Sequence, residues 1–312
     1  MNYLAKRQQP EKLYHSVAPV VIHPFYHAVC EEYTPHIHSL YKPKNSREFE
    51  ADLDFLLRHF QPVDAHQVFE YQVKCRPVEQ NSFHLSFDDG LREVYEVALP
   101  LLQQKGIPAT LFINTAFVDN KELFFRHKAA LLVDRWRQKP PSPATQKEID
   151  RLLSVPYSER DQLDEAAALL EVDFQDYLKK NKPYLTTEEI KALQQKGFTI
   201  GAHSIDHPRY AQLEKTEQIR QTLDSCAYVK KTFNEPKTFF SFPFSEDDVP
   251  DSFMKAIRPQ VDLSFGIRGM KIGQEGRLVG RIDMEKKGKD AQDTINQAFL
   301  KYKILQILLS YT

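Results

Sequence analysis

Short apolar runs alternate with longer segments of helical periodicity along most of the chain. The helical segments lie at 46–60, 94–106, 185–197 and 216–233. We expect strands at the apolar runs 20–26, 62–65, 82–89, 109–114, 198–204, 238–244, 263–267 and 276–284. Alternation of strands and helices is typical of parallel βαβ units. Seven or eight such strands predict an α/β fold with a closed or nearly closed (β/α) barrel, and an open doubly wound sheet is the alternative.

The strand predicted at 82–89 ends in two adjacent carboxylates. Apolar side chains at alternate positions face one way, while His84 and Asp88 share the other face. Asp89 and Gly90 follow, and a glycine is typical of a turn. Barrel enzymes carry their active residues at the C-terminal ends of strands. One carboxylate there would bind a metal ion while the other acts on water, and His84 would either support that site or fill the barrel.

A second polar cluster follows the strand predicted at 198–204. His203 and His207 are four residues apart, a spacing that places two side chains on one face of a helix. Pro208 directly follows and disfavours helical angles at His207, so we expect a loop. Two histidines and one of the two aspartates, with open positions for water, would make a catalytic metal shell. Zinc or another divalent transition metal is the ion that we expect.

Residues 121–182 interrupt the alternation of strands and helices. The stretch is helical and charged, with a predicted loop at 140–145. One stripe of it is apolar: Leu163, Ala166, Ala167 and Leu170. We therefore expect a helical insertion within one catalytic domain that spans 1–312. A lid over the site and a surface for a partner are both open as its role.

Composition and charge exclude several classes of protein. Lys plus Arg is 42 and Asp plus Glu is 43, so neither nucleic acid nor an acidic membrane is an expected partner. The three cysteines, Cys30, Cys75 and Cys226, form no disulfide framework. No stretch is long enough to span a membrane, and residues 1–12 lack the apolar core of a secretory signal, which predicts a cytoplasmic protein. The apolar tail at 303–312 predicts a helix end docked on the body. No pattern predicts an oligomeric state.

Several segments resemble the polysaccharide deacetylase family, which is carbohydrate esterase family 4 and includes the nodulation-type chitooligosaccharide deacetylases. Ser-Phe-Asp-Asp-Gly at 86–90 is similar to the first family signature, T-F-D-D-G. His-Ser-Ile-Asp-His-Pro at 203–208 is similar to the second, H-[ST]-x-x-H-P. Pro-Phe-Tyr-His-Ala-Val at 24–29 resembles a segment of members that act on poly-N-acetylglucosamine. The resemblance covers most of the chain outside the insertion.

The resemblance implies a distorted (β/α) barrel and a hydrolase that removes acetyl groups from sugars. It makes Asp88 the general base that activates water. It gives the metal three ligands: Asp89, His203 and His207. The third signature, whose Pro243 and Phe244 match, would supply a backbone N–H from Phe244 to the oxyanion. Acetylated sugars or glycans are the substrates that this implies.

The chain departs from the family at two positions. Ser241 stands where the third signature has an arginine, and we hypothesise that Arg281 takes over that role from a neighbouring strand. The family's C-terminal histidine, a general acid, has no counterpart after His207. His27 is our candidate for the acid, and Glu285 is a second one.

Three functions remain open at this point. The first is a deacetylase of N-acetylated sugars. The second is a related metal hydrolase of another non-peptide C–N bond, such as that of a cyclic amide. The third is a non-catalytic glycan-binding protein that retains the metal site, which the two departures motivate. The presence of Asp88 argues against the third, because metal binding alone requires no base.

Overall fold

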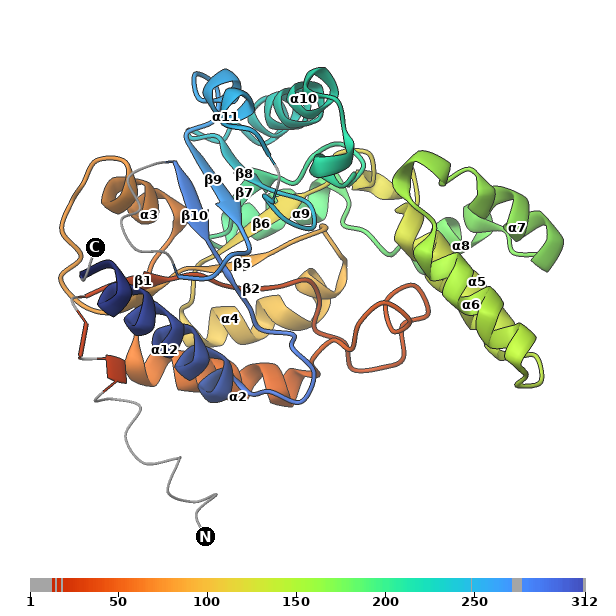
Figure 1. Cartoon of the computed structure of the whole chain (residues 1–312), viewed down its shortest axis with the longest axis horizontal. Helices are drawn as coiled ribbons and strands as arrows, with labels where there is room; N and C mark the ends of the chain where they lie inside the picture. Colours follow the sequence, from red (N-terminus) through yellow and green to blue (C-terminus); the bar gives the residue numbers. More distant parts are fainter. Residues whose placement is uncertain (1–12, 15, 18, 248, 271–276, 311–312) are drawn as a thin grey trace, which may run out of the picture.

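A nearly closed barrel of parallel strands forms the body of the molecule (Figure 1). The computed structural model describes residues 13–310 except 15, 18, 248 and 271–276. Within these residues the main sheet has the order β10-β9-β8-β7-β6-β5-β2-β11, and all its pairs are parallel. Its strands are β2 (Pro24–Tyr26), β5 (Leu85–Phe87), β6 (Ala109–Ile113), β7 (Thr199–Ala202), β8 (Phe239–Ser241), β9 (Leu263–Gly266), β10 (Leu278–Gly280) and β11 (Ile282–Asp283). The predicted (β/α) barrel is confirmed.

The barrel closes at Arg281. The two edge strands of the sheet, β10 and β11, are successive parts of one chain segment with only this residue between them. The N–H of Arg281 donates to the carbonyl of Gly266 (3.0 Å), and the N–H of Ile282 donates to that of His23 (2.8 Å). The single strand predicted at 276–284 therefore has two halves with different partners, and residue 276 lies outside the described residues. Closure in this way excludes the open doubly wound sheet.

Two other predicted strands are interrupted, each at a histidine. Their first halves, β1 and β4, pair with β3 in a second parallel sheet of order β1-β4-β3. Its strands are β1 (Val21–Ile22), β4 (Ser82–Phe83) and β3 (Gln61–Pro62). His23 and His84, at the two breaks, are buried with ring centroids 5.6 Å apart. Burial, helped by Arg281, lowers the pKa of His23 to about 3. His84 bonds Thr110 Oγ1 (2.8 Å), so it fills the barrel interior.

Helices cover the outer faces of the barrel (Figure 1). They are α2 (Ser46–His59), α3 (Ala65–Gln72), α4 (Leu99–Lys105), α9 (Thr187–Gln195), α10 (Lys215–Phe233), α11 (Asp251–Ile257) and α12 (Ala291–Ser310). Thr186 and Glu189 form a capping box at the start of α9. The N-cap of α2 is Asn45, one residue before the helical segment expected from residue 46. Asn45 accepts the N–H of Glu48, whose side chain completes the capping box.

Two sequence predictions near prolines need correction. The strand expected at 62–65 ends at Pro62, because Asp64 caps α3 and so starts a helix that the pattern did not predict. The helix expected at 94–106 has two parts, a π-helical turn (Val94–Ala98) and then α4. Pro100 lies in the first turn of α4, where a missing N–H is tolerated. Gly106 ends α4 at φ 65°, as expected.

The predicted insertion is helical and extends away from the barrel (Figure 1). Its helices are α5 (Phe125–Arg137), α6 (Pro143–Ser154), α7 (Gln162–Leu170) and α8 (Phe174–Asn181). All four residues of the predicted apolar stripe on α7 are buried. Ser142 caps α6, so the loop expected at 140–145 is shorter than predicted. The hydrophobic cluster that contains these α7 residues also includes Ala28, Cys30 and Ile37. The insertion therefore packs against the loop between β2 and α2, which we call the N-terminal loop.

The tail of the chain differs from the expectation. α12 lies beside α2, and Phe299 is buried. Beyond it, Ile304 and Leu308 are 57% and 59% exposed, so the predicted docking of the tail is wrong there. In these turns the partly buried residues are Tyr302, Lys303 and Gln306.

The remaining expectations concern membranes, the N-terminus and cysteines. In the described part of the chain no helix is both long enough and apolar enough to cross a membrane. Residues 1–12, from which the absence of a secretory signal was predicted, lie outside the described residues. All three cysteines are free, in agreement with the expectation of no disulfide framework.

Candidate metal and catalytic site

The end of β5 turns two adjacent carboxylates toward one place. The strand stops at Phe87, and Asp88 and Asp89 follow it. Asp89 has φ 71° and Gly90 has φ 68°, both in the left-handed region. These angles end the alternation of the strand, so neighbouring side chains need not point apart. The turn thus allows both carboxylates to serve one site, as the sequence requires.

The loop after β7 presents two buried histidines. Its backbone is left-handed at Ser204 (φ 70°) and at His207 (φ 62°), which agrees with the expected loop. The Ser204 hydroxyl accepts the N–H of His207 at 3.0 Å and so fixes the turn. The N–H of His203 donates to the carbonyl of Ile113 on β6 at 2.8 Å. The loop is therefore held against the end of the neighbouring strand.

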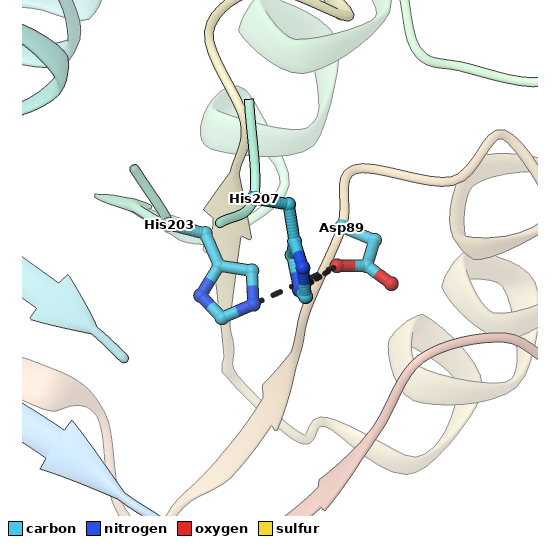
Figure 2. A group of neighbouring side chains, drawn as sticks. All are labelled: Asp89, His203 and His207. Carbon is cyan, nitrogen blue, oxygen red and sulfur yellow. Dashed lines mark ion pairs between the residues drawn. The ribbon is translucent and has the colours of Figure 1, made fainter. Parts of the chain in front are cut away.

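Asp89, His203 and His207 form one compact group of possible metal ligands (Figure 2). One donor atom from each lies within 4.8 Å of the others. Asp89 Oδ1 is 3.2 Å from His207 Nε2 and 3.6 Å from His203 Nε2. Among the described residues this buried oxygen accepts no well-formed hydrogen bond, as suits a ligand oxygen. Two imidazole nitrogens and one carboxylate oxygen are the donors of a catalytic site for a divalent transition metal.

The protonation states of the group suit a metal. Burial lowers the pKa of His203 to about 4, against the opposing effect of Asp88. Burial acts to raise the pKa of Asp89, but the charge interaction with His207 and other nearby groups outweighs burial and holds that pKa below its usual range. An ionised carboxylate and a neutral imidazole are the forms that coordinate metal ions.

A backbone carbonyl fixes the orientation of His203. Its Nδ1 lies 2.8 Å from the carbonyl oxygen of Ser241 on β8. Because a carbonyl can only accept, Nδ1 carries the proton and Nε2 is left with a free lone pair toward Asp89. This is the usual support of a metal-binding histidine.

Arg281 lies on Asp88, where the hypothesis of a relocated arginine requires it. Its Nη1 and Nη2 donate to Asp88 Oδ1 and Oδ2, each at 2.7 Å. Nη2 also donates to the hydroxyl of Ser241 at 2.7 Å. Arg281 therefore contacts the serine that stands at the family's arginine position. The guanidinium is fully buried and stacks over Phe25, 4.3 Å from the ring centroid. Asp88 Oδ2 is 3.8 Å from His203 Nε2, so this pair borders the possible metal ligands.

The charge of Asp88 follows from the same contact. Burial acts to raise its pKa, but Arg281, followed by His203, outweighs burial and lowers the pKa below its ordinary value. Asp88 is therefore ionised, and its carboxylate is held in one orientation by a bidentate pair.

His27 lies near this group and is paired with Glu285. Its Nδ1 is 2.5 Å from Glu285 Oε2, and Glu285 also accepts the N–H of His27 at 3.0 Å. Burial disfavours the charged imidazole, but Glu285, and with it Asp89 and Asp88, outweighs burial and raises the pKa of His27 to about 10. The His27 side chain is 28% exposed, so a protonated imidazole faces solvent in part.

Pro243 and Phe244 lie beside the histidine loop. The Phe244 ring centroid is 4.7 Å from that of His207, and the Arg209 guanidinium lies over the same ring at 4.7 Å. Phe244 has φ 59°, a left-handed angle directly after the buried Pro243. The structure thus brings these two predicted residues to the same site.

Three aromatic residues near the site carry no signature in the sequence. Phe124, before α5, has its ring centroid 4.5 Å from that of His207. Tyr157 donates to Asp206 in the histidine loop at 2.6 Å. The ring centroid of Tyr41 is 5.2 Å from that of His27. All three come from the insertion or the N-terminal loop, where no spacing rule connects them to the strand ends.

Comparison with known proteins agrees with this geometry. A model of the polysaccharide deacetylase family matches residues 76–258, more than half of the chain. The match includes both strand ends that carry the possible metal ligands. No curated protein sequence matches the chain significantly.

Two solved structures have the same fold. The deacetylase PplD of Streptococcus pyogenes, in complex with acetate, is 16% identical, with a TM-score of 0.61 over 90% of this chain and 99% of that one. IcaB from Ammonifex degensii is 15% identical, with a TM-score of 0.60 over 89% of this chain and 96% of that one. At these identities the likeness supports the barrel fold alone.

Proposed function

Because the chain belongs to the polysaccharide deacetylase family, we propose that it is a metal-dependent hydrolase that removes acetyl groups from N-acetylated sugars. Family membership supports a carbohydrate deacetylase. The observation that carries the finer proposal is the pairing of Asp88 with Arg281 beside the group of Asp89, His203 and His207. A base and a metal shell at one strand end are the parts that amide hydrolysis requires.

Asp89, His203 and His207 would hold the ion, with zinc as the first candidate because zinc prefers this mixture of nitrogen and oxygen ligands. A bound divalent ion acts as a Lewis acid that polarises a carbonyl oxygen and makes water a better nucleophile at neutral pH. The low pKa of His203 leaves its imidazole neutral for this purpose.

Asp88 would be the general base. Its ionised carboxylate accepts a proton from the water that attacks the acetyl carbonyl carbon. Arg281 occupies one lone pair on each carboxylate oxygen, which fixes the carboxylate plane and leaves the other lone pairs available. The cost is a weaker base, because the cation lowers the pKa of Asp88.

His27 would be the general acid. With its pKa raised to about 10, the imidazole is protonated at neutral pH. Nδ1 is committed to Glu285, so Nε2–H is the proton to donate. As the carbon–nitrogen bond breaks, this proton passes to the leaving nitrogen, and the products are acetate and the free amine of the sugar. The N–H of Phe244 would stabilise the oxyanion, as the resemblance implies.

The test is acetate release from N-acetylglucosamine oligomers with added zinc, by the wild type and by Asp88→Asn. We expect turnover in the wild type, loss of about 10²-fold or more in the variant, and equal zinc binding in both. Removal of the metal with a chelator should abolish turnover, and zinc should restore it. Zinc binding without acetate release from any acetylated sugar would overturn the proposal. Turnover of small cyclic amides instead would assign the same site to another C–N bond.

A further inference from the structure

The helical insertion contacts the loop that would supply two metal ligands, and the residues directly after it contact the turn that would supply the third. We propose that it is a fixed wall of the active site, which positions the ligand loop through Phe124 and Tyr157. This inference rests on the proposed function, because it takes Asp89, His203 and His207 as the metal site. It assigns the insertion a role in metal affinity, in place of the lid or partner surface that the sequence left open.

The first contact holds the ring of His207. Its Nδ1 atom is buried and has no hydrogen-bond partner among the described residues. Metal-binding histidines usually donate this second N–H to an acceptor, as His203 does to a carbonyl. The His207 ring instead packs against two phenylalanines, with centroids 4.5 Å from Phe124 and 4.7 Å from Phe244. Packing therefore replaces the hydrogen bond that would orient the ligand, and the insertion supplies one of the two surfaces.

The second contact holds the backbone of the same loop. The Tyr157 hydroxyl donates to Asp206 Oδ2 at 2.6 Å, and Gln221 on α10 donates to Asp206 Oδ1 at 2.7 Å. Asp206 directly precedes His207, whose φ of 62° is unfavourable for a residue with a side chain. Such angles persist when surrounding contacts over-determine them. Tyr157 is one of those contacts, and it comes from the insertion.

The third contact joins the residues directly after the insertion to the turn with the two carboxylates. Where the insertion returns to the barrel, the N–H of Leu185 donates to the carbonyl of Gly90 at 3.0 Å. The neighbouring Tyr184 hydroxyl accepts the N–H of Phe124 at 3.0 Å and bonds His127 Nδ1 at 2.7 Å. Tyr184 and His127 are each 1% exposed. Tyr184, directly after the insertion, thus bonds Phe124 near its start, and the adjacent Leu185 bonds Gly90, the residue after Asp89.

The contacts of Phe124, His127 and Tyr184 are buried, and the bond between Tyr157 and Asp206 is partly buried. A lid would have to break them at every turnover, leaving buried hydroxyl and imidazole groups unpaired at a cost of about 1–3 kcal/mol each. The insertion therefore acts as a rigid support that sets where His207 lies relative to Asp89 and His203.

The experiment measures zinc affinity by competition with a chromophoric chelator. We compare the full-length wild type with Tyr157→Phe and Phe124→Leu. Tyr33→Phe is the matched control, because Tyr33 donates to Asp134 of α5 at 2.7 Å and so also loses a tyrosine–aspartate bond on the insertion, on its exposed surface. We expect affinity to fall about 10-fold or more in the first two variants, the size seen when outer-shell supports of ligands are removed, and to be unchanged in Tyr33→Phe.

A second readout separates positioning from general loss of structure. The metal-free variants should unfold within a few degrees of the metal-free wild type, and acetate release should recover at saturating zinc. Zinc affinity equal to the wild type in Tyr157→Phe and Phe124→Leu would overturn the inference and leave the proposed function standing. A wild type that binds no zinc would overturn both. If Phe124→Leu fails to fold, Tyr157→Phe, which keeps the ring, decides alone.

Discussion

Replacement of Arg281, at the barrel closure, tests directly how Asp88, the proposed base, is held. In Arg281→Ser, Asp88 keeps its burial of 2% exposure but loses both 2.7 Å hydrogen bonds and its only bidentate partner among the described residues. Removal of one partner from a buried ion pair costs about 3–5 kcal/mol. That is a large part of the roughly 5–15 kcal/mol by which domains are stable.

The dependence on pH has a defined sign. The pKa of Asp88 is lowered in the folded protein, so its ion pair stabilises the fold above the ordinary carboxyl range, and that stability is lost as pH falls through the folded pKa. Without Arg281, burial loses its largest opposing effect, and the pKa of Asp88 should rise. The difference in unfolding free energy between wild type and variant should therefore be largest near neutral pH and shrink in acid. The acid limb of the rate profile should move to higher pH.

The assay is urea unfolding of the metal-free proteins, with acetate release measured on the same preparations. Ser241→Arg combined with Arg281→Ser is the matched rescue, because it returns the arginine to the family's position beside the same carboxylate. We expect the double variant to regain more than half of the lost unfolding free energy and part of the turnover. If Arg281→Ser alone costs less than about 1 kcal/mol and leaves turnover unchanged, the assigned role of Arg281 is wrong.

Two further predictions concern the acid and the barrel closure. Glu285→Gln removes the largest effect that opposes burial, so the pKa of His27 should fall from about 10 toward its ordinary value of about 6.5 or below. The basic limb of the rate profile should then move into the neutral range. An unmoved limb would exclude His27 as the acid. Gly280→Ala places a Cβ against the backbone carbonyl of Gly269, and thermal unfolding should report a loss of about 1–3 kcal/mol; a melting temperature equal to that of the wild type would show that this backbone can give way.

The parts of the site that sequence could predict are those that local rules determine. A few residues of sequence predict that the adjacent carboxylates lie at the end of an alternating strand. Likewise, a proline directly after the second histidine predicts that the two histidines lie on a loop. Once the strands are parallel, their C-terminal ends meet at one edge, so Asp89, His203 and His207 come together. The position of Arg281 beside Asp88 was also predictable, because Ser241 departs from the family signature and Arg281 follows in a later strand; its role stays a prediction.

The parts that could not be predicted depend on contacts between distant segments. The breaks at His23 and His84 occur where two strands pass each other in the barrel, and neither sequence alone marks a break. Phe124 and Tyr157 belong to the insertion, whose helical pattern predicts its own core but not what it touches. The prediction that the tail of α12 docks on the body was wrong for a related reason. Apolar residues occur on most sides of its last turns, so no apolar stripe indicates which face meets the body.

Closure of the barrel at Arg281 also has a consequence for the order in which the site matures. Arg281 follows Asp88 by 193 residues, so a ribosome has released the carboxylate, and later both histidines, long before their cationic neighbour emerges. Until then the buried position of Asp88 lacks its counter-charge, and the strand edges of β9 and β2 are unpaired. Docking of one short segment late in synthesis then joins the two sheet edges and gives Asp88, the proposed base, its counter-charge in the same step. A nascent chain would become hydrolytic only when its architecture is finished.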